Sequence, residues 1–368
     1  GADVITRIKA ANEGKLEELQ ACIQQELYTM LAKLLSDTKV SASQVKKIVI
    51  AGNTTMCHLL LGYSCAGLGR APFLPVDIGL TKITMQKLFE TVKIREDQSV
   101  GFDVSDAEVV ILPGISAFVG ADIVAGMYYC DMDVKEELLM LLDVGTNGEM
   151  VIGNKEGFVA ASTAAGPVFE GGNISCGMPA VKGAVAHIKE DAWEVVGDVE
   201  PEGICGSGLV DLTAYLLDTQ VIDENGTLCD AYFEAGYPIN SCLKNNPVDR
   251  NMKLTQADIR ELQMGKAAIR AGIDVLTEIC EPEMICLAGG FGTALDIASA
   301  VKIDLLPKQW QERIKPVGNA ALEGAQKFLL DGAGAERVND IVEKSREVLL
   351  AEQGKFEEKY IHFMQFLI

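Results

Sequence analysis

The alternation of apolar and polar positions predicts an α/β protein in which short strands alternate with helices. The apolar run Leu138 to Leu142 ends at Asp143, and the chain returns in two further runs at 149–152 and 158–163. Three such runs joined by polar, glycine-containing turns predict a β-meander. Other short, mostly apolar runs, each followed by glycine and a helical pattern, lie at 46–51, 109–112, 284–288 and 314–317.

Helical spacing of apolar residues predicts a helix over 15–35 and further helices from about 117 to 129 and from 206 to 217. A fourth helix begins at the capping-box pattern Thr255-x-x-Asp258. The predicted apolar face of the helix at 15–35 is formed by Leu16, Leu19, Ile23, Leu27, Met30, Leu31 and Leu34. The predicted apolar face of the fourth helix is formed by Ile259, Leu262, Ile269, Ile273 and Leu276.

The Asp143 turn has the composition of a site for a metal-bound phosphate. Glycines in Gly145-Thr146-Asn147-Gly148 would let backbone N–H groups approach phosphate oxygens, and Thr146 adds a hydroxyl. Asp143 is suited to hold Mg²⁺ or one of its waters. An ordinary hairpin is the alternative, because Asn-Gly is a strong hairpin signal.

Composition narrows the classes of function and compartment. The chain has 368 residues and a net charge of −21, which argues against nucleic acid and anionic membranes as partners. The longest uncharged stretch, 48–69, contains too many polar residues and glycines for a membrane span. Ten cysteines without a C-x-x-C pair, and no resemblance to a signal peptide, indicate free thiols in the cytoplasm. Neither a P-loop nor a full G-x-G-x-x-G is present.

The two halves of the chain resemble each other. KKIVIAGNTTM (46–56) parallels EMICLAGGFGTAL (283–295), and the segment 109–126 parallels 314–329. Only the second pair is preceded by a meander, so we expect a duplicated fold whose first lobe has its opening strands upstream of Gly1. The predicted division places a partial first lobe at 1–135 and a second lobe at 136–368.

These motifs resemble those of the superfamily of acetate and sugar kinases, heat-shock chaperones and actin. The resemblance implies two ribonuclease-H-like lobes, an actin-like ATPase fold, with nucleotide between them. It makes DVGTNG (143–148) the second phosphate motif and AGGFG (288–292) the adenosine motif, where Gly289, Gly290 and Gly292 pass close to adenosine. The segments 113–122 and 317–324 correspond to the two connecting helices.

A narrower resemblance rests on six motifs that occur in order along the chain. The first is the opening GADVITRI, and the other five are IAGNTTM, LDVGTNGE, STAAGPVFEGGNISCGM, GICGSGLVDL and LAGGFG. Together they resemble the C-terminal part of the reductive activators of corrinoid proteins. This family implies ATP and Mg²⁺ as ligands, a corrinoid protein as partner, a homodimer, and reduction of cob(II)amide to cob(I)amide. Electrons would come from an N-terminal ferredoxin domain with a two-iron cluster, whose C-x₄-C-x₂-C pattern this chain lacks. We expect no reduction by this part alone.

Several assignments keep an alternative. Asp122 is either a second acidic group near the metal or a surface or capping aspartate. Gly206, Ser207 and Gly208 either meet nucleotide at a helix N-terminus or form a plain helix entry with Ser207 as N-cap. Cys205 and Cys176 flank the glycine-rich loops and are expected to be buried thiols. For Cys205 the alternative, by likeness to the activators of 2-hydroxyacyl-CoA dehydratases, is a dimer-bridging iron–sulfur cluster. A small-molecule kinase and a chaperone-like protein share the fold.

Overall fold

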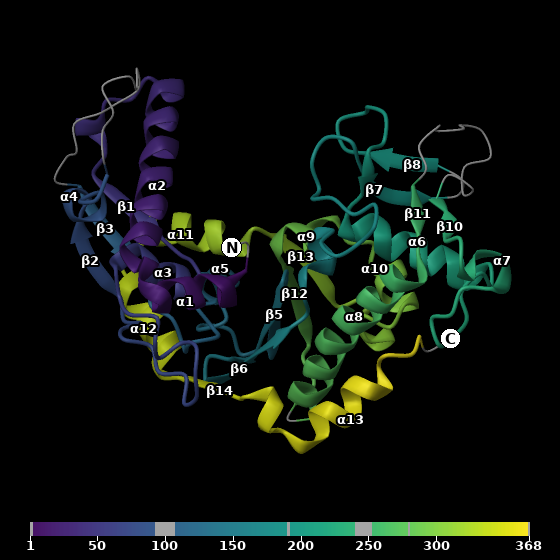
Figure 1. Ribbon diagram of the computed structural model, residues 1–368. Coiled ribbons are helices and arrows are strands. Elements are labelled where there is room, and N and C mark those ends of the chain that lie inside the picture. The colour runs from purple at the N-terminus through teal and green to yellow at the C-terminus, as the bar shows by residue number, and fades with distance from the viewer. Residues whose placement is uncertain (1–2, 93–106, 190–191, 240–251, 279, 367–368) are drawn as a thin grey trace. The chain divides into compact units, whose positions relative to one another are not determined.

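A computed structural model describes residues 3–92, 107–189, 192–239, 252–278 and 280–366 (Figure 1). The chain forms two compact units. The first comprises Gly1–Val134, Lys155–Phe158 and Ala320–Glu347, and the second comprises Lys135–Asn154, Val159–Asn319 and Val348–Ile368. The sequence-based division into 1–135 and 136–368 stays a prediction about the two lobes, and packing places 320–347 in the first unit.

A three-stranded sheet forms the centre of the first unit. Strand β1 (Lys47–Ile50) pairs in parallel with β3 (Glu108–Ile111), which pairs antiparallel with β2 (Thr81–Thr84). The order is β1-β3-β2. Three positions of β3 are buried, whereas all four positions of β1 are half-buried because β1 lies at the edge of this sheet in the described part of the chain.

Helices surround the sheet and one another in the first unit. In the described residues they are α1 (Val4–Ala10), α2 (Leu16–Thr38), α3 (Thr54–Leu61), α4 (Met85–Leu88), α5 (Ala121–Tyr129), α11 (Ala320–Leu330) and α12 (Gly334–Glu343), and a short strand β14 (Ser345–Glu347) follows them. The two predicted connecting helices, α5 and α11, pack directly on each other. A Cβ atom at Gly324 would lie 2.0 Å from the carbonyl oxygen of Ala125, so this crossing requires glycine.

The predicted apolar face of α2 is wrong at two positions. Met30 and Leu34 are 61% and 57% exposed, although helical spacing placed them with the core residues. Buried Gln24 takes part in the contact face because its polar atoms are paired: Nε2 donates to the carbonyl oxygen of Leu60 at 3.1 Å. Its Oε1 accepts hydrogen bonds from the backbone N–H and the hydroxyl of Thr91. Apolar spacing alone does not reveal such a satisfied glutamine.

The sheet of the second unit contains the predicted meander. The strands are β4 (Leu139–Val144), β5 (Asn147–Asn154), β6 (Gly157–Ala164), β12 (Met284–Ala288) and β13 (Ile314–Gly318), in the order β13-β12-β4-β5-β6. Strand β12 is parallel to both β4 and β13, and β5 is antiparallel to β4. The meander is therefore confirmed.

Both units share the architecture that the internal repeat predicted. In the first unit β1 and β3 are parallel neighbours, followed in the sequence by α3 and α5. In the second unit β12 and β13 are parallel neighbours, followed in the sequence by α9 (Gly289–Ala294) and by α11, which belongs to the first unit. Within the described residues, the first unit has no counterpart of the meander. The duplicated α/β fold is confirmed.

Smaller elements complete the second unit. Strands β7 (Ala184–Lys189), β8 (Ala192–Val195) and β9 (Gly203–Ile204) form a small sheet with the order β8-β7-β9. Strand β10 (Tyr237–Pro238) pairs with β11 (Lys253–Leu254). The remaining α-helices of this unit are α6 (Gly206–Asp218), α7 (Asp230–Phe233), α8 (Gln256–Thr277), α10 (Ile297–Lys302) and α13 (Gly354–His362).

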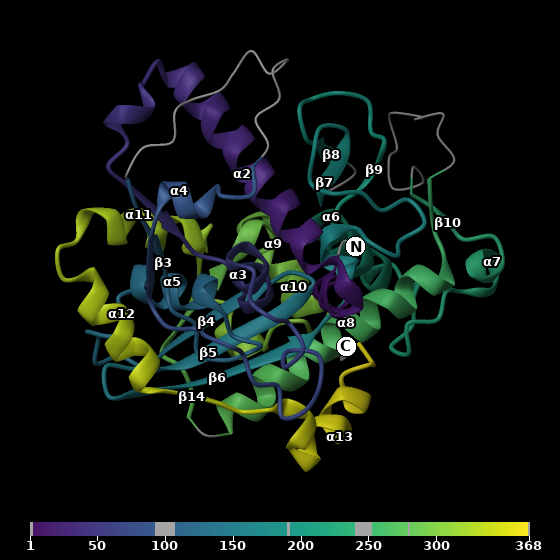
Figure 2. The ribbon, with the colours of Figure 1, turned by 60° about the vertical axis from the view of Figure 1, so that its left-hand side comes forward.

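Helix α8 runs along the meander sheet (Figure 2). Its capping box is confirmed: the hydroxyl of Thr255 accepts from the backbone N–H of Asp258, and the Asp258 carboxylate accepts from the backbone N–H of Thr255 at 2.7 Å. The predicted apolar residues of α8 are fully buried. They are Ile259, Leu262, Ile269, Ile273 and Leu276.

A fully buried lysine of α8 holds the C-terminal segment. The Nζ atom of Lys266 donates to the carbonyl oxygens of Phe363 at 2.7 Å and Gln365 at 2.6 Å, and lies 5.1 Å from the ring centre of Phe366. Burial lowers the pKa of Lys266 to about 8. These contacts compensate the cost of burying the amine.

Replacing Lys266 with Met should lower the free energy of unfolding by about 1–3 kcal/mol, because two buried carbonyl oxygens lose their donor. The unfolded chain, with a lysine pKa of 10.5, keeps a proton that the folded protein loses near pH 8. Wild-type stability should therefore rise with pH between these values, and the difference from Lys266→Met should grow by about 2 kcal/mol between pH 8 and 10.

Urea denaturation at both pH values measures this difference, and Lys308→Met, at an exposed position of the same unit, controls for loss of one positive charge. A difference that stays constant or shrinks as the pH rises would contradict the prediction.

Candidate functional site

The ends of two parallel strands bring the predicted phosphate and adenosine motifs together. Strand β4 ends at the Asp143 turn, and β12 ends where Gly289 begins α9. In their register Ala288 lies opposite Asp143. Ligands of open α/β sheets bind at such carboxyl ends of parallel strands. Two motifs about 145 residues apart in the sequence thus form one edge of the sheet.

The contact between the two motifs is close at Gly289. This residue has φ +85°, and a Cβ atom on it would lie 2.5 Å from Oδ1 of Asp143. Both the positive φ and the short distance require glycine. The backbone at the start of α9 therefore lies directly against the carboxylate that we expect to hold the metal.

The turn after Asp143 is closed and partly accessible. The backbone N–H of Gly145 donates to the carbonyl oxygen of Asn147 at 2.9 Å, and Gly145, Thr146 and Asn147 are half-buried. Gly148 is buried, and a Cβ atom there would lie 1.9 Å from Cδ1 of Ile269 on α8. Gly148 thus has a packing role in addition to any contact with phosphate.

A carboxylate that the sequence-based prediction did not include lies on this turn. Oε1 of Glu170 accepts hydrogen bonds from the backbone N–H of Thr146 at 3.0 Å and from its hydroxyl at 2.9 Å. Glu170 ends a short 3₁₀ helix, Pro167–Glu170, in the glycine-rich segment after β6. One sequence feature could have identified it: Glu170 is the single acidic residue between positions 164 and 178.

The adenosine motif contains one open glycine and one packed glycine. A Cβ atom at exposed Gly290 would meet no atom within 4 Å, whereas one at Gly292 would lie 2.8 Å from Cγ of Leu287. Phe291 lies between them and contacts Phe169 of the 3₁₀ helix, with ring centres 4.8 Å apart. Gly290 therefore leaves space beside the chain for a ligand.

The entry of α6 is buried in protein. Cβ atoms at Gly206 and Gly208 would lie 2.0 Å from the carbonyl oxygen of Phe169 and 2.3 Å from that of Val185. The prediction of Ser207 as N-cap is wrong: Cys205 is the N-cap residue, and the Ser207 hydroxyl lies inside the first turn. That hydroxyl donates to the carbonyl oxygen of Ala186 at 2.9 Å. Nucleotide contact by 206–208 stays a prediction.

Cys205 and Cys176 have the surroundings of structural thiols. Cys205 is 2% exposed, and its Sγ atom lies 3.4 Å from the carbonyl oxygen of Val185. The Sγ atom of Cys176 lies 3.4 Å from the carbonyl oxygen of Lys253, and burial raises the pKa of Cys176 to about 11. A buried thiol such as that of Cys205 behaves as a small apolar side chain.

In the first unit, the turn after β1 meets the start of α5. Asn53 caps α3 by accepting from the backbone N–H of Met56 at 2.9 Å. A Cβ atom at Gly120 would lie 2.6 Å from the Cα atom of Asn53 and 2.9 Å from Oδ1 of Asp122. Burial raises the pKa of Asp122, whose Oδ1 accepts from the backbone N–H of Ile123. Asp122 is thus a desolvated carboxyl beside a strand-end turn.

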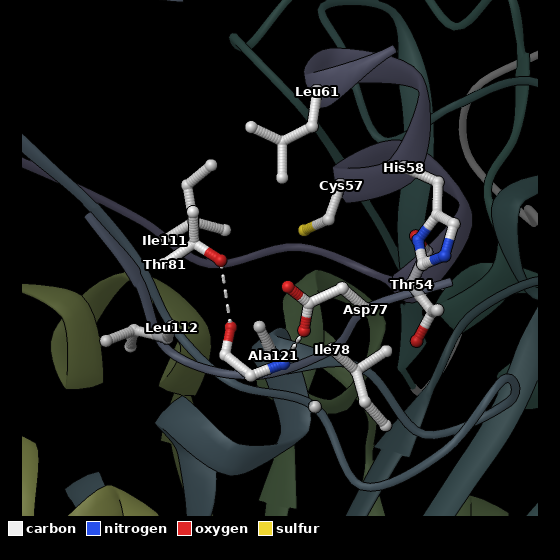
Figure 3. A pocket seen from close by; sticks show the side chains of 12 residues that line it. Thr54, Cys57, His58, Leu61, Asp77, Ile78, Thr81, Ile111, Leu112 and Ala121 are labelled. Carbon is white, nitrogen blue, oxygen red and sulfur yellow. Dashed lines mark hydrogen bonds between the residues drawn. The ribbon is translucent and has the colours of Figure 1, made fainter. Parts of the chain in front are cut away.

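A small pocket lies beside this turn (Figure 3). His58, 1% exposed, accepts from the backbone N–H of Val76 at Nε2, and its Nδ1 lies 2.9 Å from the carbonyl oxygen of Thr54, which fixes the neutral Nδ1–H form. Burial raises the pKa of Cys57 to about 12. The pocket has a volume of about 20 Å³, room for about one water, and cannot hold nucleotide.

The donor set suits magnesium carried by a nucleotide. Among the described residues, no three or more His, Cys, Asp or Glu side chains are grouped to hold a metal ion. Mg²⁺ is usually bound through one or two carboxylates, waters and substrate phosphates. Asp143 at the edge of an accessible turn meets that requirement.

Within the same described residues, no helix is both long and apolar enough to cross a membrane.

Replacing Gly289 with Ala should lower the free energy of unfolding by about 1–3 kcal/mol, because the methyl group enters the position of Asp143 Oδ1 and the positive φ is strained. The matched variant Gly290→Ala should be at least as stable as the wild type, since its methyl group meets no atom and alanine lowers the entropy of the unfolded chain. Urea denaturation of both variants gives the comparison. Equal stabilities would contradict the described contact at Asp143.

Comparisons with known proteins identify the family of this chain. A family model described as the C-terminal domain of RACo, the ASKHA domain, matches 137–367, and one described as the RACo middle region matches 1–135. The corrinoid activation enzyme RamQ of Eubacterium limosum is 31% identical over 98% of this chain and 63% of its own length. The [Co(II) methylated amine-specific corrinoid protein] reductase of Methanosarcina barkeri is 26% identical over 84% and 59%.

A solved structure of a reductive activator for corrinoid, iron–sulfur protein matches with TM-score 0.84 and 29% identity, over 100% of this chain and 60% of that one. The chain thus spans about three fifths of the length of these relatives. Two consecutive family models and a relative above 30% identity show that the chain belongs to the RACo family of reductive activators of corrinoid proteins.

Proposed function

We propose that this chain is the ATP-binding and ATP-hydrolysing part of a reductive activator that returns cob(II)amide to cob(I)amide in a methyl-transferring corrinoid protein. The observation that carries the proposal is the pairing of β4 with β12, which places Asp143 against the backbone of Gly289. A metal-holding carboxylate and a glycine-lined surface for adenosine are the two parts that a nucleotide site in this fold needs.

Each residue has a stated task in the proposed site. Asp143 holds Mg²⁺ through a water, and Gly145, Thr146 and Asn147 supply donors and space to the phosphates. Gly290 lets the adenosine approach the chain at the start of α9. Asp122 remains proposed as a second acidic group. When bound, Mg²⁺ would neutralise the negative charge that develops on the phosphate oxygens during hydrolysis.

Hydrolysis serves conformational work in this proposal. A population shift between two conformations, driven by different affinities for ATP and its products, changes partner affinity or cobalt ligation enough to favour reduction. Electrons come from a ferredoxin-type domain with a two-iron cluster. A homodimer, which the family resemblance implies, is part of the same proposal, and so is the cytoplasmic location that the cysteine pattern indicates.

Substitution of Gly290 should change the affinity for ATP and leave the fold intact. A methyl group at Gly290 meets no protein atom but enters the space proposed for adenosine. Gly290→Ala should therefore weaken Mg·ATP binding about tenfold or more, equivalent to about 1.4 kcal/mol or more, without lowering the stability of the fold. Isothermal titration of the protein, expressed with its natural flanking sequence, measures this affinity. Gly332→Ala, also in open space but on another segment, is the control.

The same protein should hydrolyse ATP faster when a cob(II)amide-containing corrinoid protein is added, and Asp143→Asn should abolish this stimulation. Wild-type protein that binds no ATP, or whose ATPase responds to no corrinoid partner, would overturn the proposed function. Phosphorylation of a small-molecule acceptor would instead indicate a kinase.

A further inference from the structure

Glu170 occupies two of the hydrogen-bond donors that the proposed site offers to phosphate, both of them on Thr146. One of its oxygens, Oε1, accepts from both the backbone N–H and the hydroxyl of Thr146, at 3.0 and 2.9 Å. The same oxygen would lie 3.3 Å from a Cβ atom on Gly145. The carboxylate therefore lies over the first two residues of the phosphate-binding turn.

A carboxylate and a phosphate cannot use these donors together. Both are anions that accept hydrogen bonds from N–H and O–H groups, and a donor that already serves one has little left for the other. A carboxylate and a phosphate that share these donors would also lie close together, and their negative charges would repel each other. Nucleotide binding at Thr146 must therefore break the contacts of Glu170 or be weakened by them.

The surroundings let the Glu170 side chain leave while its backbone stays in place. The backbone N–H of Gly166 donates to the carbonyl oxygen of Thr146 at 2.9 Å, so the segment before the 3₁₀ helix is fixed to the turn. Phe169 packs on Phe291 and lies against Gly206, which holds the helix itself. Glu170, in contrast, is exposed, so its carboxylate can turn into solvent without burying charge.

We propose that Glu170 is a positioning residue that holds the phosphate-binding turn in the nucleotide-free protein and is displaced from Thr146 by the phosphates of ATP. This inference rests on the proposed function and adds to it a competition within the site. The carboxylate keeps the donors of Thr146 ordered until the phosphates of ATP replace it. The apparent affinity for ATP is then the intrinsic affinity multiplied by the fraction of protein in which Glu170 has left the turn.

Removal of this competitor should tighten the binding of phosphate-bearing ligands alone. Glu170→Ala should bind Mg·ATP roughly tenfold more tightly than the wild type, as expected when the competent fraction rises from about a tenth to nearly all. Glu170→Gln, which loses the charge and keeps an acceptor oxygen, should give a smaller gain. Affinity for adenosine, which has no phosphate, should be unchanged in both variants.

Isothermal titration with Mg·ATP and with adenosine, on the protein with its natural flanking sequence, measures these affinities. Glu137→Gln is the control, since it removes the charge of another exposed glutamate of the same unit. Unfolding curves of the variants establish that they are folded, and Glu170→Gln replaces Glu170→Ala if the latter is not.

Each outcome decides the inference. Tighter ATP binding with unchanged adenosine binding supports displacement of Glu170. ATP affinity that is equal to or weaker than that of the wild type overturns it and leaves the proposed function standing. A gain that is the same for adenosine also overturns it, because the effect is then not at the phosphates. If neither wild type nor variant binds ATP, the proposed function fails and the inference fails with it.

Discussion

The pairing of β12 with β4 is the constraint on which the candidate site depends. Parallel strands end at the same edge of a sheet, and this register sets Ala288 opposite Asp143. The next residue, Gly289, has a positive φ, and a side chain there would meet the Asp143 carboxylate, so the position requires glycine. A shift of one residue would turn the side chains of β12 to the other face and separate the two motifs.

Most predicted site glycines also serve packing, which changes how their role should be tested. Gly148, Gly206, Gly208 and Gly292 each lie where a Cβ atom would overlap protein atoms. Substituting any of them would alter the fold and the site together, so loss of activity would not identify a ligand contact. Gly290 is different because the space beside it is open, and it separates nucleotide binding from folding.

Sequence patterns predicted much of the fold because local rules determine those elements. The meander followed from apolar runs and turn residues, and α8 followed from its capping box and apolar spacing. The patterns failed where tertiary contacts decide. Buried Gln24 is paired across the unit, Met30 and Leu34 are exposed despite their spacing, and Ser207 hydrogen-bonds to β7 instead of capping α6. Glu170 was missed because its contact with Thr146 spans 24 residues.

The central claim, that 143–148 and 288–292 form one nucleotide site, is tested most directly by hydrogen–deuterium exchange with and without Mg·ATP. The account predicts that Mg·ATP slows amide exchange in both segments at the same ligand concentration. Protection of neither segment, or of one without the other, would contradict it.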